Sequence, residues 1–287
     1  MTADSHGYAS CKAALAEIFP LLSDGAYHFA SLNNQNEVLR FACAYIDLSL
    51  MSCMADMKCK ENPTYPILAN LAATNIYNRR DYKRSQTYFQ AYLETTDMSQ
   101  REIAFEGLAR CYYEMKDYGP AAYVASQGMK IYPRNWNMLL VGIESCGHMG
   151  DDATMETMLK AALAIQPGHK GLLEYQGKMY ERMKRYEDAS SVFRRLYDLS
   201  PNSLDYAFHL AFDYYNAGTV VYLEARQSGS AERMRVARDW FSKAAPVLRD
   251  VLDNSPYAVN VAHALATCYS LTNDNVRLRE ANNTLAA

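Results

Sequence analysis

YEMKDYGPAAYVASQGMKIYP, residues 113–133, is the stretch that decides the fold, because two further stretches of the same form follow it. They are CGHMGDDATMETMLKAALAIQP, residues 146–167, and YERMKRYEDASSVFRRLYDLSP, residues 180–201. Each stretch ends in a proline, and the prolines are 34 residues apart: Pro133, Pro167 and Pro201. A fixed period of this length indicates a chain built from repeated structural units.

Each unit carries the pattern of two helices joined by a tight turn. In the unit that ends at Pro133, small and apolar residues between Leu108 and Tyr112 have the spacing of one helical face. Residues 116–118 interrupt that face as a turn, and helical spacing then resumes until the proline stops the second helix. The same offsets recur in the next two units, so we expect three consecutive helix hairpins in register.

This pattern resembles the tetratricopeptide repeat (TPR), in which small residues on two paired helices allow a close approach and a proline ends the unit. Gly177 and Ala189 are such small residues. The tryptophan that often opens the repeat is replaced by apolar residues, namely Phe105, Leu139 and Leu173. One hairpin cannot bury its apolar face alone, so neighbouring hairpins share a core. The resemblance implies an all-α fold, a right-handed superhelical solenoid of TPR helix hairpins.

The repeat register predicts a single solenoid over residues 1–287. Residues 1–18 are expected to form an N-terminal cap, with a short helix at about 10–18. Hairpins are predicted, in chain order, at 19–50, 64–97, 101–134, 136–168, 170–202 and 204–256, followed by a C-terminal repeat and cap at 257–287.

Two segments interrupt the register. Residues 51–62 separate the first hairpin from the second and are predicted to be an inserted loop. Residues 219–239 are inserted into the sixth hairpin, keep helical spacing and contain no proline. We therefore expect the two helices of that hairpin to continue into an extended, projecting hairpin. Pro246 is expected to kink its second helix.

The order of these features resembles a family of bacterial tandem-TPR proteins that are often made with an export signal. It includes AYIDLSLM (44–51) before the long loop, NPTYPILA (62–69) after it, and the extended penultimate hairpin. The resemblance implies no catalytic activity. MTADSHGYAS (1–10) lacks the apolar region of a signal peptide. The localisation is therefore periplasmic or exported if a leader was removed, and otherwise cytoplasmic.

Composition argues against several classes of function. The net charge of −3 predicts no nucleic-acid partner, which would need a basic stripe. The absence of a long apolar run predicts no membrane insertion. Cys53 and Cys59 are close enough to be bridged, but free thiols are favoured for all seven cysteines. Methionines and cysteines in 51–62 could suit copper(I), although no histidine joins them and loop packing is favoured.

The sequence contains no GxSxG, no HExxH and no glycine-rich phosphate loop. The six histidines are scattered; His148 and His263 could face a groove, but a lone histidine on a helical repeat is more often a polar surface residue than a ligand. We therefore expect a protein that is not an enzyme and that uses no cofactor and no metal.

In a TPR array the first helix of each hairpin lines the inner surface, so the resemblance places a binding groove there. The repeat register gives its inward residues outside the core as Asn70, Thr74, Tyr77, Asn78, Glu106, Arg110, Tyr113, Leu140, Glu144, Glu174, Lys178, Arg182, Phe208, Phe212 and Tyr215. Mixed charge beside aromatic rings suits an extended peptide or a partner helix. The last three residues form one helical stripe that either lines the groove or packs beneath the extended hairpin. The Lys and Asn pattern of carboxylate-clamp TPR domains is not reproduced.

The leading hypothesis is a non-catalytic scaffold that binds a peptide or a partner subunit on its concave face. The alternative is a self-associating structural protein that uses the extended hairpin at 219–240, with Trp240 as an anchor, and would be a homo-oligomer. The sequence leaves the identity of the partner open.

Overall fold

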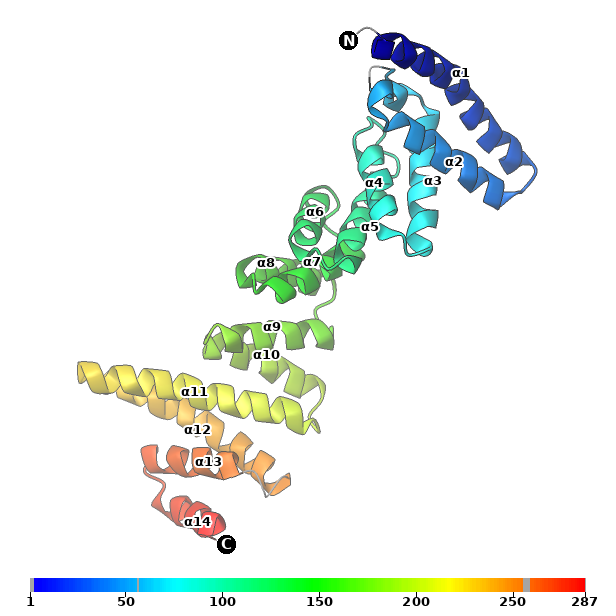
Figure 1. Ribbon diagram of the computed structural model, residues 1–287. Helices are drawn as coiled ribbons and strands as arrows, with labels where there is room; N and C mark the ends of the chain where they lie inside the picture. The colour runs from blue at the N-terminus through cyan, green and yellow to red at the C-terminus, as the bar shows by residue number, and fades with distance from the viewer. Residues whose placement is uncertain (1–2, 56, 255–258, 287) are drawn as a thin grey trace. The chain divides into compact units, whose positions relative to one another are not determined.

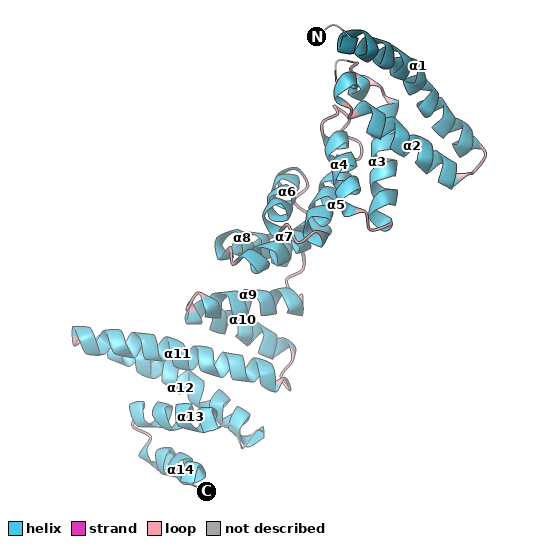
Figure 2. Ribbon diagram, viewed as in Figure 1, coloured by secondary structure: helices cyan, strands magenta, loops and turns pink. Residues whose placement is uncertain are grey.

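The computed structural model describes residues 3–55, 57–254 and 259–286, and every regular element in these ranges is a helix (Figures 1 and 2). The elements are α1 (Ala3–Ser31), α2 (Gln35–Ser49), η1 (Ser52–Met54), η2 (Cys59–Glu61), α3 (Thr64–Asn78), α4 (Tyr82–Leu93), α5 (Arg101–Glu114), α6 (Tyr118–Ile131), α7 (Trp136–Met149), α8 (Asp152–Ile165), α9 (Lys170–Arg182), α10 (Tyr186–Leu199), α11 (Leu204–Ser228), α12 (Ala231–Asn254), α13 (Val259–Leu271) and α14 (Asn275–Ala286). The predicted all-α array of helix hairpins is confirmed.

The turns inside the hairpins repeat one local geometry. In six of them, the first or second residue after the first helix has a positive φ: Asn33, Arg80, Lys116, Gly150, Lys184 and Asn273. The next backbone N–H then bonds to a carbonyl five residues earlier, as from Asp117 to Tyr112 at 2.9 Å and from Arg185 to Tyr180 at 2.9 Å. This is the Schellman ending of a helix, which satisfies carbonyls that the helix leaves free. The 34-residue period is therefore visible in the backbone as well as in the sequence.

The chain divides into two compact units, Met1–Ala161 and Ala162–Ala287, each described here by itself. In the first unit, Phe19 of α1 stacks on Tyr45 of α2 with ring centroids 4.1 Å apart. A chain of polar contacts joins the next three helices: Ser85 donates to the carbonyl of Ala73 at 2.8 Å, and Cys111 donates to Ser85 at 3.3 Å. Small buried residues thus hold α3, α4 and α5 close together.

Glycines in the first unit admit aromatic rings between helices. A Cβ added at Gly107 of α5 would lie well inside contact distance of the Phe89 ring of α4. A Cβ added at Gly25 of α1 would likewise lie too close to the ring of Phe41 of α2. The alternation of small and large residues in the sequence is thus the physical cause of the close helix packing.

The second unit has its own core, formed by α11, α12 and α13 around buried residues such as Phe241, Leu248 and Leu265. At Gly177 of α9, an added Cβ would lie 2.6 Å from the ring of Phe193 of α10. The helices α11 and α12 are 25 and 24 residues long, and Pro246 lies inside α12. The predicted boundary between residues 256 and 257 lies outside the described residues.

The N-terminal helix differs from the prediction. The sequence indicated a short helix to about residue 18 and a separate one after it, whereas α1 is one helix of 29 residues that contains Pro20. Its apolar face is continuous across the proline, because Leu15, Phe19 and Leu22 all pack on the same core. That shared burial outweighs the lost backbone hydrogen bond. The single solenoid and its N-terminal cap stay predictions.

The loop between α2 and α3 contains the two short helices η1 and η2. Cys59 is buried and Cys53 is partly buried there, and both are free thiols, as are the other five cysteines. Among the described residues, no group of three or more His, Cys, Asp or Glu side chains could hold a metal ion.

Candidate functional site

Two helical stripes in the first unit face one groove. On α3, Thr74, Tyr77 and Asn78 share a face because they are three to four residues apart. On α5, Glu106 and Arg110 are four residues apart and face the same space. These five residues line a pocket of about 200 Å³, together with Phe89, Ile103 and Gly107. We call this pocket the α3–α5 groove.

The floor of the α3–α5 groove depends on one glycine. Phe89 of α4 is buried, and its ring reaches the groove because Gly107 carries no side chain at the point of contact. Ile103, which is exposed, adds an apolar edge on α5. The groove therefore presents an apolar surface bordered by polar side chains.

The charges of the groove are partly satisfied within the protein. The Glu106 carboxylate accepts a hydrogen bond from Asn137 at 2.9 Å and another from Asn135 at 3.2 Å. Arg110 lies 3.7 Å from Glu106, which is an ion pair without a close hydrogen bond. The guanidinium of Arg110 therefore keeps donors for a ligand, whereas the carboxylate of Glu106 is already held by two amides.

Tyr77 is the aromatic residue of the groove. Its ring lies 5.3 Å from that of Tyr82, and burial raises the pKa of its hydroxyl. Glu114 acts in the same direction and Arg110 opposes it. The hydroxyl of Tyr77 is therefore neutral near pH 7 and can both donate and accept a hydrogen bond.

Four other predicted residues of the first unit lie outside this pocket. The Asn70 amide donates to Gln100, and Leu140 and Glu144 lie half-buried on α7. Tyr113 lies near Tyr118 and His148, with ring centroids 5.7 and 6.3 Å away. The structure thus gathers five of the predicted first-unit residues and separates these four from them.

In the second unit, the predicted residue Glu174 of α9 contacts α11 through Tyr206, which the prediction did not include. Glu174 accepts a hydrogen bond from the hydroxyl of Tyr206, which raises the pKa of Tyr206 to about 12. Lys178 and Arg182 are exposed on α9. Here the inner face carries charge of both signs.

The predicted aromatic stripe on α11 is divided between surface and core. Phe208 is 41% exposed, and its ring centroid lies 4.6 Å from that of Phe212. Phe212 and Tyr215 are partly buried and pack against the core of the second unit, where Tyr215 lies 5.8 Å from Phe241 of α12. The stripe therefore packs against α12 at one end and is open at the other.

A buried acid that the sequence pattern did not reveal lies beside this stripe. Asp213 is only 1% exposed, and its Oδ2 has no hydrogen-bond partner among the described residues. Burial, with a smaller effect from Glu181, raises the pKa of Asp213 to about 8. One turn earlier, His209 lies 2.7 Å from Glu181 and stacks on Phe193 at 4.5 Å. In the sequence, the burial of Asp213 is indicated only by its position in the apolar middle of α11.

Sequence reasoning also missed Phe89, Ile103 and Gly107 in the α3–α5 groove. Ile103 and Gly107 could have been found by extending the inward stripe of α5 in both directions from Glu106. Phe89 could not, because it belongs to a second helix and reaches the groove only through the gap at Gly107.

Comparison with known structures finds many matches to helical repeat proteins. A TPR protein from Parabacteroides merdae is 11% identical, with 76% of this chain and 77% of that chain covered and a TM-score of 0.48. YrrB, described as a TPR protein with an unusual peptide-binding site, is 16% identical over 73% of this chain and 94% of that one, with a TM-score of 0.47. The chain is similar to TPR proteins.

A third similar structure is the C-terminal part of a TPR repeat-containing protein from Cytophaga hutchinsonii. It is 14% identical, covers 92% of this chain and 93% of that one, and has a TM-score of 0.47. No protein-family model matches the chain, and no curated protein matches it. Among the described residues, no helix is long and apolar enough to cross a membrane. The TPR-like description therefore rests on the repeated hairpins and turns of the chain itself.

Proposed function

We propose that this protein is a non-catalytic interaction scaffold that binds an extended peptide segment of a partner in the α3–α5 groove. The observation that supports the proposal is the convergence of Thr74, Tyr77, Asn78, Glu106 and Arg110 on one pocket. The groove offers an apolar floor for one side chain and polar groups at its border for the peptide backbone. Extended peptides are commonly recognised in this way.

The chemistry of the groove predicts which peptides bind. Phe89 and Ile103 favour an apolar side chain, and Arg110 favours a carboxylate nearby. Glu106 keeps its negative charge, but Asn135 and Asn137 already donate to both of its oxygens and Arg110 lies 3.7 Å away, so it offers less to a basic peptide than Arg110 offers to an acidic one. We therefore expect partner segments with an apolar residue close to an acidic one.

Selection from a displayed random-peptide library on the full chain tests this proposal. Peptides with an apolar residue beside an acidic one should be enriched, and their affinity is measured by fluorescence polarisation. The variant Tyr77→Ala/Arg110→Gln should weaken binding by about tenfold or more, because central aromatic and arginine contacts dominate such interfaces.

The matched control is Tyr123→Ala/Arg134→Gln, which removes an exposed tyrosine and an exposed arginine away from the groove. A further variant, Thr74→Trp, fills the groove from an exposed position and should also abolish binding. Circular dichroism checks that each variant is folded. Equal affinity of the groove variants and the control would overturn the proposal.

Exposed apolar residues on α11 and α12 favour a second candidate function, self-association through this hairpin. Val220 and Leu223 of α11 and Val236 of α12 are exposed. Trp240, the predicted anchor, is partly buried against Tyr214, with ring centroids 5.8 Å apart. The hairpin thus exposes aliphatic side chains while its tryptophan packs within the chain.

Light scattering separates the two candidates. If the hairpin mediates self-association, the chain is a dimer or larger, and Val220→Glu/Leu223→Glu converts it to a monomer. A chain that is monomeric over the whole concentration range would exclude this candidate and leave the α3–α5 groove unaffected.

A further inference from the structure

A second and larger pocket lies in the first unit, between α1, α2, the end of α3 and the start of α4. Its volume is about 460 Å³, within the range of pockets that bury most of a small ligand. It is lined by Leu22, Asn36, Leu39, Arg40, Phe41, Cys43, Ala44, Asp47, Ile76, Arg79 and Arg84. We call it the arginine pocket. It shares no lining residue with the α3–α5 groove.

The inner wall of the arginine pocket is apolar. Leu39 and Cys43 of α2 and Ile76 of α3 are buried beneath it, and Leu22 of α1 and Phe41 contribute further apolar surface. A polar ligand would have to leave water without replacing its hydrogen bonds on this wall. The wall therefore favours a ligand with an apolar body.

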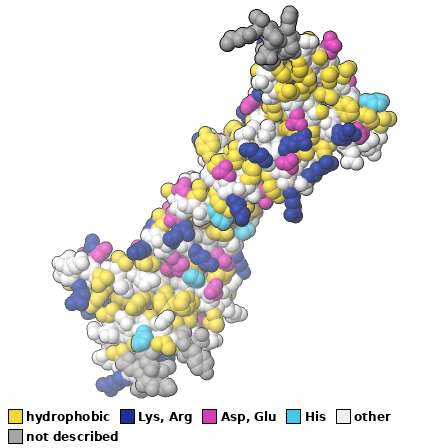
Figure 3. Space-filling model, in the orientation of Figure 1, with side chains coloured by type: hydrophobic (Ala, Val, Ile, Leu, Met, Phe, Trp, Pro, Cys, Tyr) yellow, Lys and Arg dark blue, Asp and Glu magenta, His cyan; other side chains and the backbone are white. Residues whose placement is uncertain are grey.

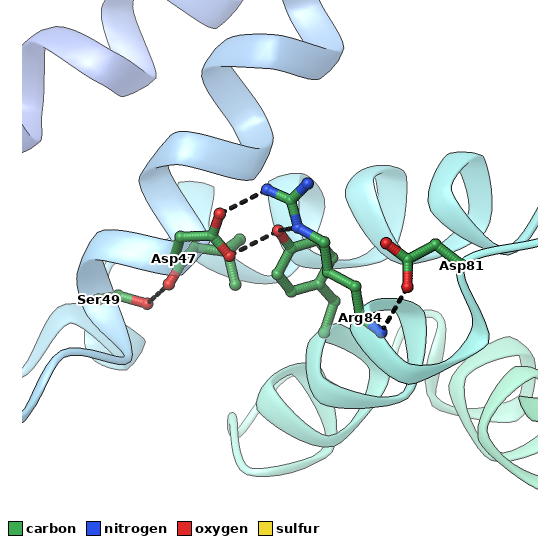
Figure 4. Close-up of polar contacts among 6 residues, drawn as sticks. Asp47, Ser49, Asp81 and Arg84 are labelled. Carbon is green, nitrogen blue, oxygen red and sulfur yellow. Dashed lines mark hydrogen bonds and ion pairs between the residues drawn. The ribbon is translucent and has the colours of Figure 1, made fainter. Parts of the chain in front are cut away.

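The rim of the arginine pocket is positively charged, with three arginines and a single acid, Asp47. Asp47 is already engaged: its two oxygens accept hydrogen bonds from Arg84 at 2.5 Å and from the Tyr88 hydroxyl at 2.6 Å, and Arg84 also donates to Tyr88 at 2.6 Å (Figure 4). This network orients Arg84 and cancels one positive charge of the rim. On the face seen in Figure 3, Lys and Arg side chains lie among both hydrophobic and acidic side chains.

Two arginines are left for a ligand. Arg40 pairs with Glu37 at 2.8 Å, but it is strongly exposed, and such a pair contributes little. Arg79, in the turn after α3, has no side-chain hydrogen bond or ion pair to any described residue. Burial raises the pKa of the Cys43 thiol, and the charges of Arg84 and Arg79 oppose that rise. The charges of Arg79 and Arg84 therefore both act on the inner wall of the pocket.

We propose that the arginine pocket binds a small apolar carboxylate, with its hydrocarbon part on Leu39 and Ile76 and its carboxylate on Arg79. A guanidinium matches a carboxylate in shape and charge and can donate two parallel hydrogen bonds to it. The apolar wall excludes small hydrophilic anions, and the charged rim disfavours neutral apolar molecules. The pocket therefore favours a molecule that has both an apolar body and a carboxylate.

Isothermal titration calorimetry of the full chain with sodium decanoate tests the proposal. Decanoate should bind with a stoichiometry of one, while decanol and acetate should each bind at least about tenfold more weakly. Arg79→Gln should lower the affinity for decanoate by about tenfold or more. Ala44→Trp, which fills the pocket from an exposed position, should abolish binding.

The matched control is Arg80→Gln, which removes the same charge one residue further along, outside the pocket. It should leave the affinity for decanoate unchanged. Equal losses of decanoate affinity in Arg79→Gln and Arg80→Gln would show that the effect comes from the net charge of the protein, and would overturn the proposal. A stoichiometry well above one that Ala44→Trp does not change would also overturn it. The same holds if decanoate fails to bind while a peptide with an apolar C-terminal residue binds tightly.

Discussion

Replacing Asp213 with asparagine is expected to raise the free energy of unfolding by roughly 2–4 kcal/mol at pH 8. Asp213 is buried in α11, and its Oδ2 lacks a hydrogen-bond partner among the described residues. An ionised carboxylate in this position would lie in an apolar environment close to Glu181. Asparagine has nearly the same shape and never carries the charge.

The direction of the pH dependence follows from the raised pKa. In the unfolded chain the Asp213 carboxyl loses its proton near pH 4, whereas in the folded protein it keeps the proton to about pH 8. The folded state therefore binds more protons than the unfolded state between these values, and stability falls as pH rises through this interval. Below pH 4 both states are protonated and no penalty arises.

Urea unfolding followed by circular dichroism at a series of pH values measures this effect. The variant should lose the part of the pH dependence between about pH 4 and pH 8 that Asp213 causes, and should match the wild type at pH 4. Asp239→Asn, at an exposed position of α12, is the control and should leave the profile unchanged. A profile of Asp213→Asn that follows the wild type at every pH would contradict the burial of this acid.

Replacing Gly107 with alanine is expected to destabilise the protein by about 1–3 kcal/mol. The added methyl group would collide with the ring of Phe89, which is 2% exposed and packed in the core. The ring must then move toward the α3–α5 groove, which should also weaken peptide binding. Thermal and denaturant unfolding report the first effect, and peptide affinity reports the second.

Two further variants isolate the cause. Phe89→Leu in the Gly107→Ala background should recover part of the lost stability, because the smaller side chain removes the collision, and the two changes will not be additive. Gly147→Ala is the matched control, since the nearest atom to its added Cβ is Met155 Cε at 3.9 Å. There the gain in helix propensity should stabilise the protein by about 0.5–1 kcal/mol. A loss at Gly147→Ala as large as that at Gly107→Ala would contradict the close packing described here.

The hairpins could be predicted from sequence because each carries local information. The closing prolines, the turn residues and the small residues at helix contacts all repeat with one period, so several observations point to the same helix ends. The turns at Lys116, Gly150 and Lys184 show the backbone cause of that period. The long N-terminal helix could not be predicted, because a proline in its middle is locally unfavourable and only the tertiary contacts of Phe19 and Leu22 compensate for it.

The groove could be predicted only in part. Residues on one helix face are fixed by helical spacing, so the sequence places Thr74, Tyr77 and Asn78 on one stripe. The depth of the pocket depends on Phe89, whose place is set by contact between helices. The arginine pocket escaped prediction for the same reason, since its lining comes from four helices and a turn that no repeat position marks.

Hydrogen exchange of the full chain, with and without a selected peptide, tests the central claim most directly. The claim is that partners dock in the α3–α5 groove. We predict slower exchange on peptide binding in Thr64–Asn78 and Arg101–Glu114, with no change in Tyr118–Ile131. Protection confined to Leu204–Ser228 and Ala231–Asn254, with none in α3 or α5, would contradict it.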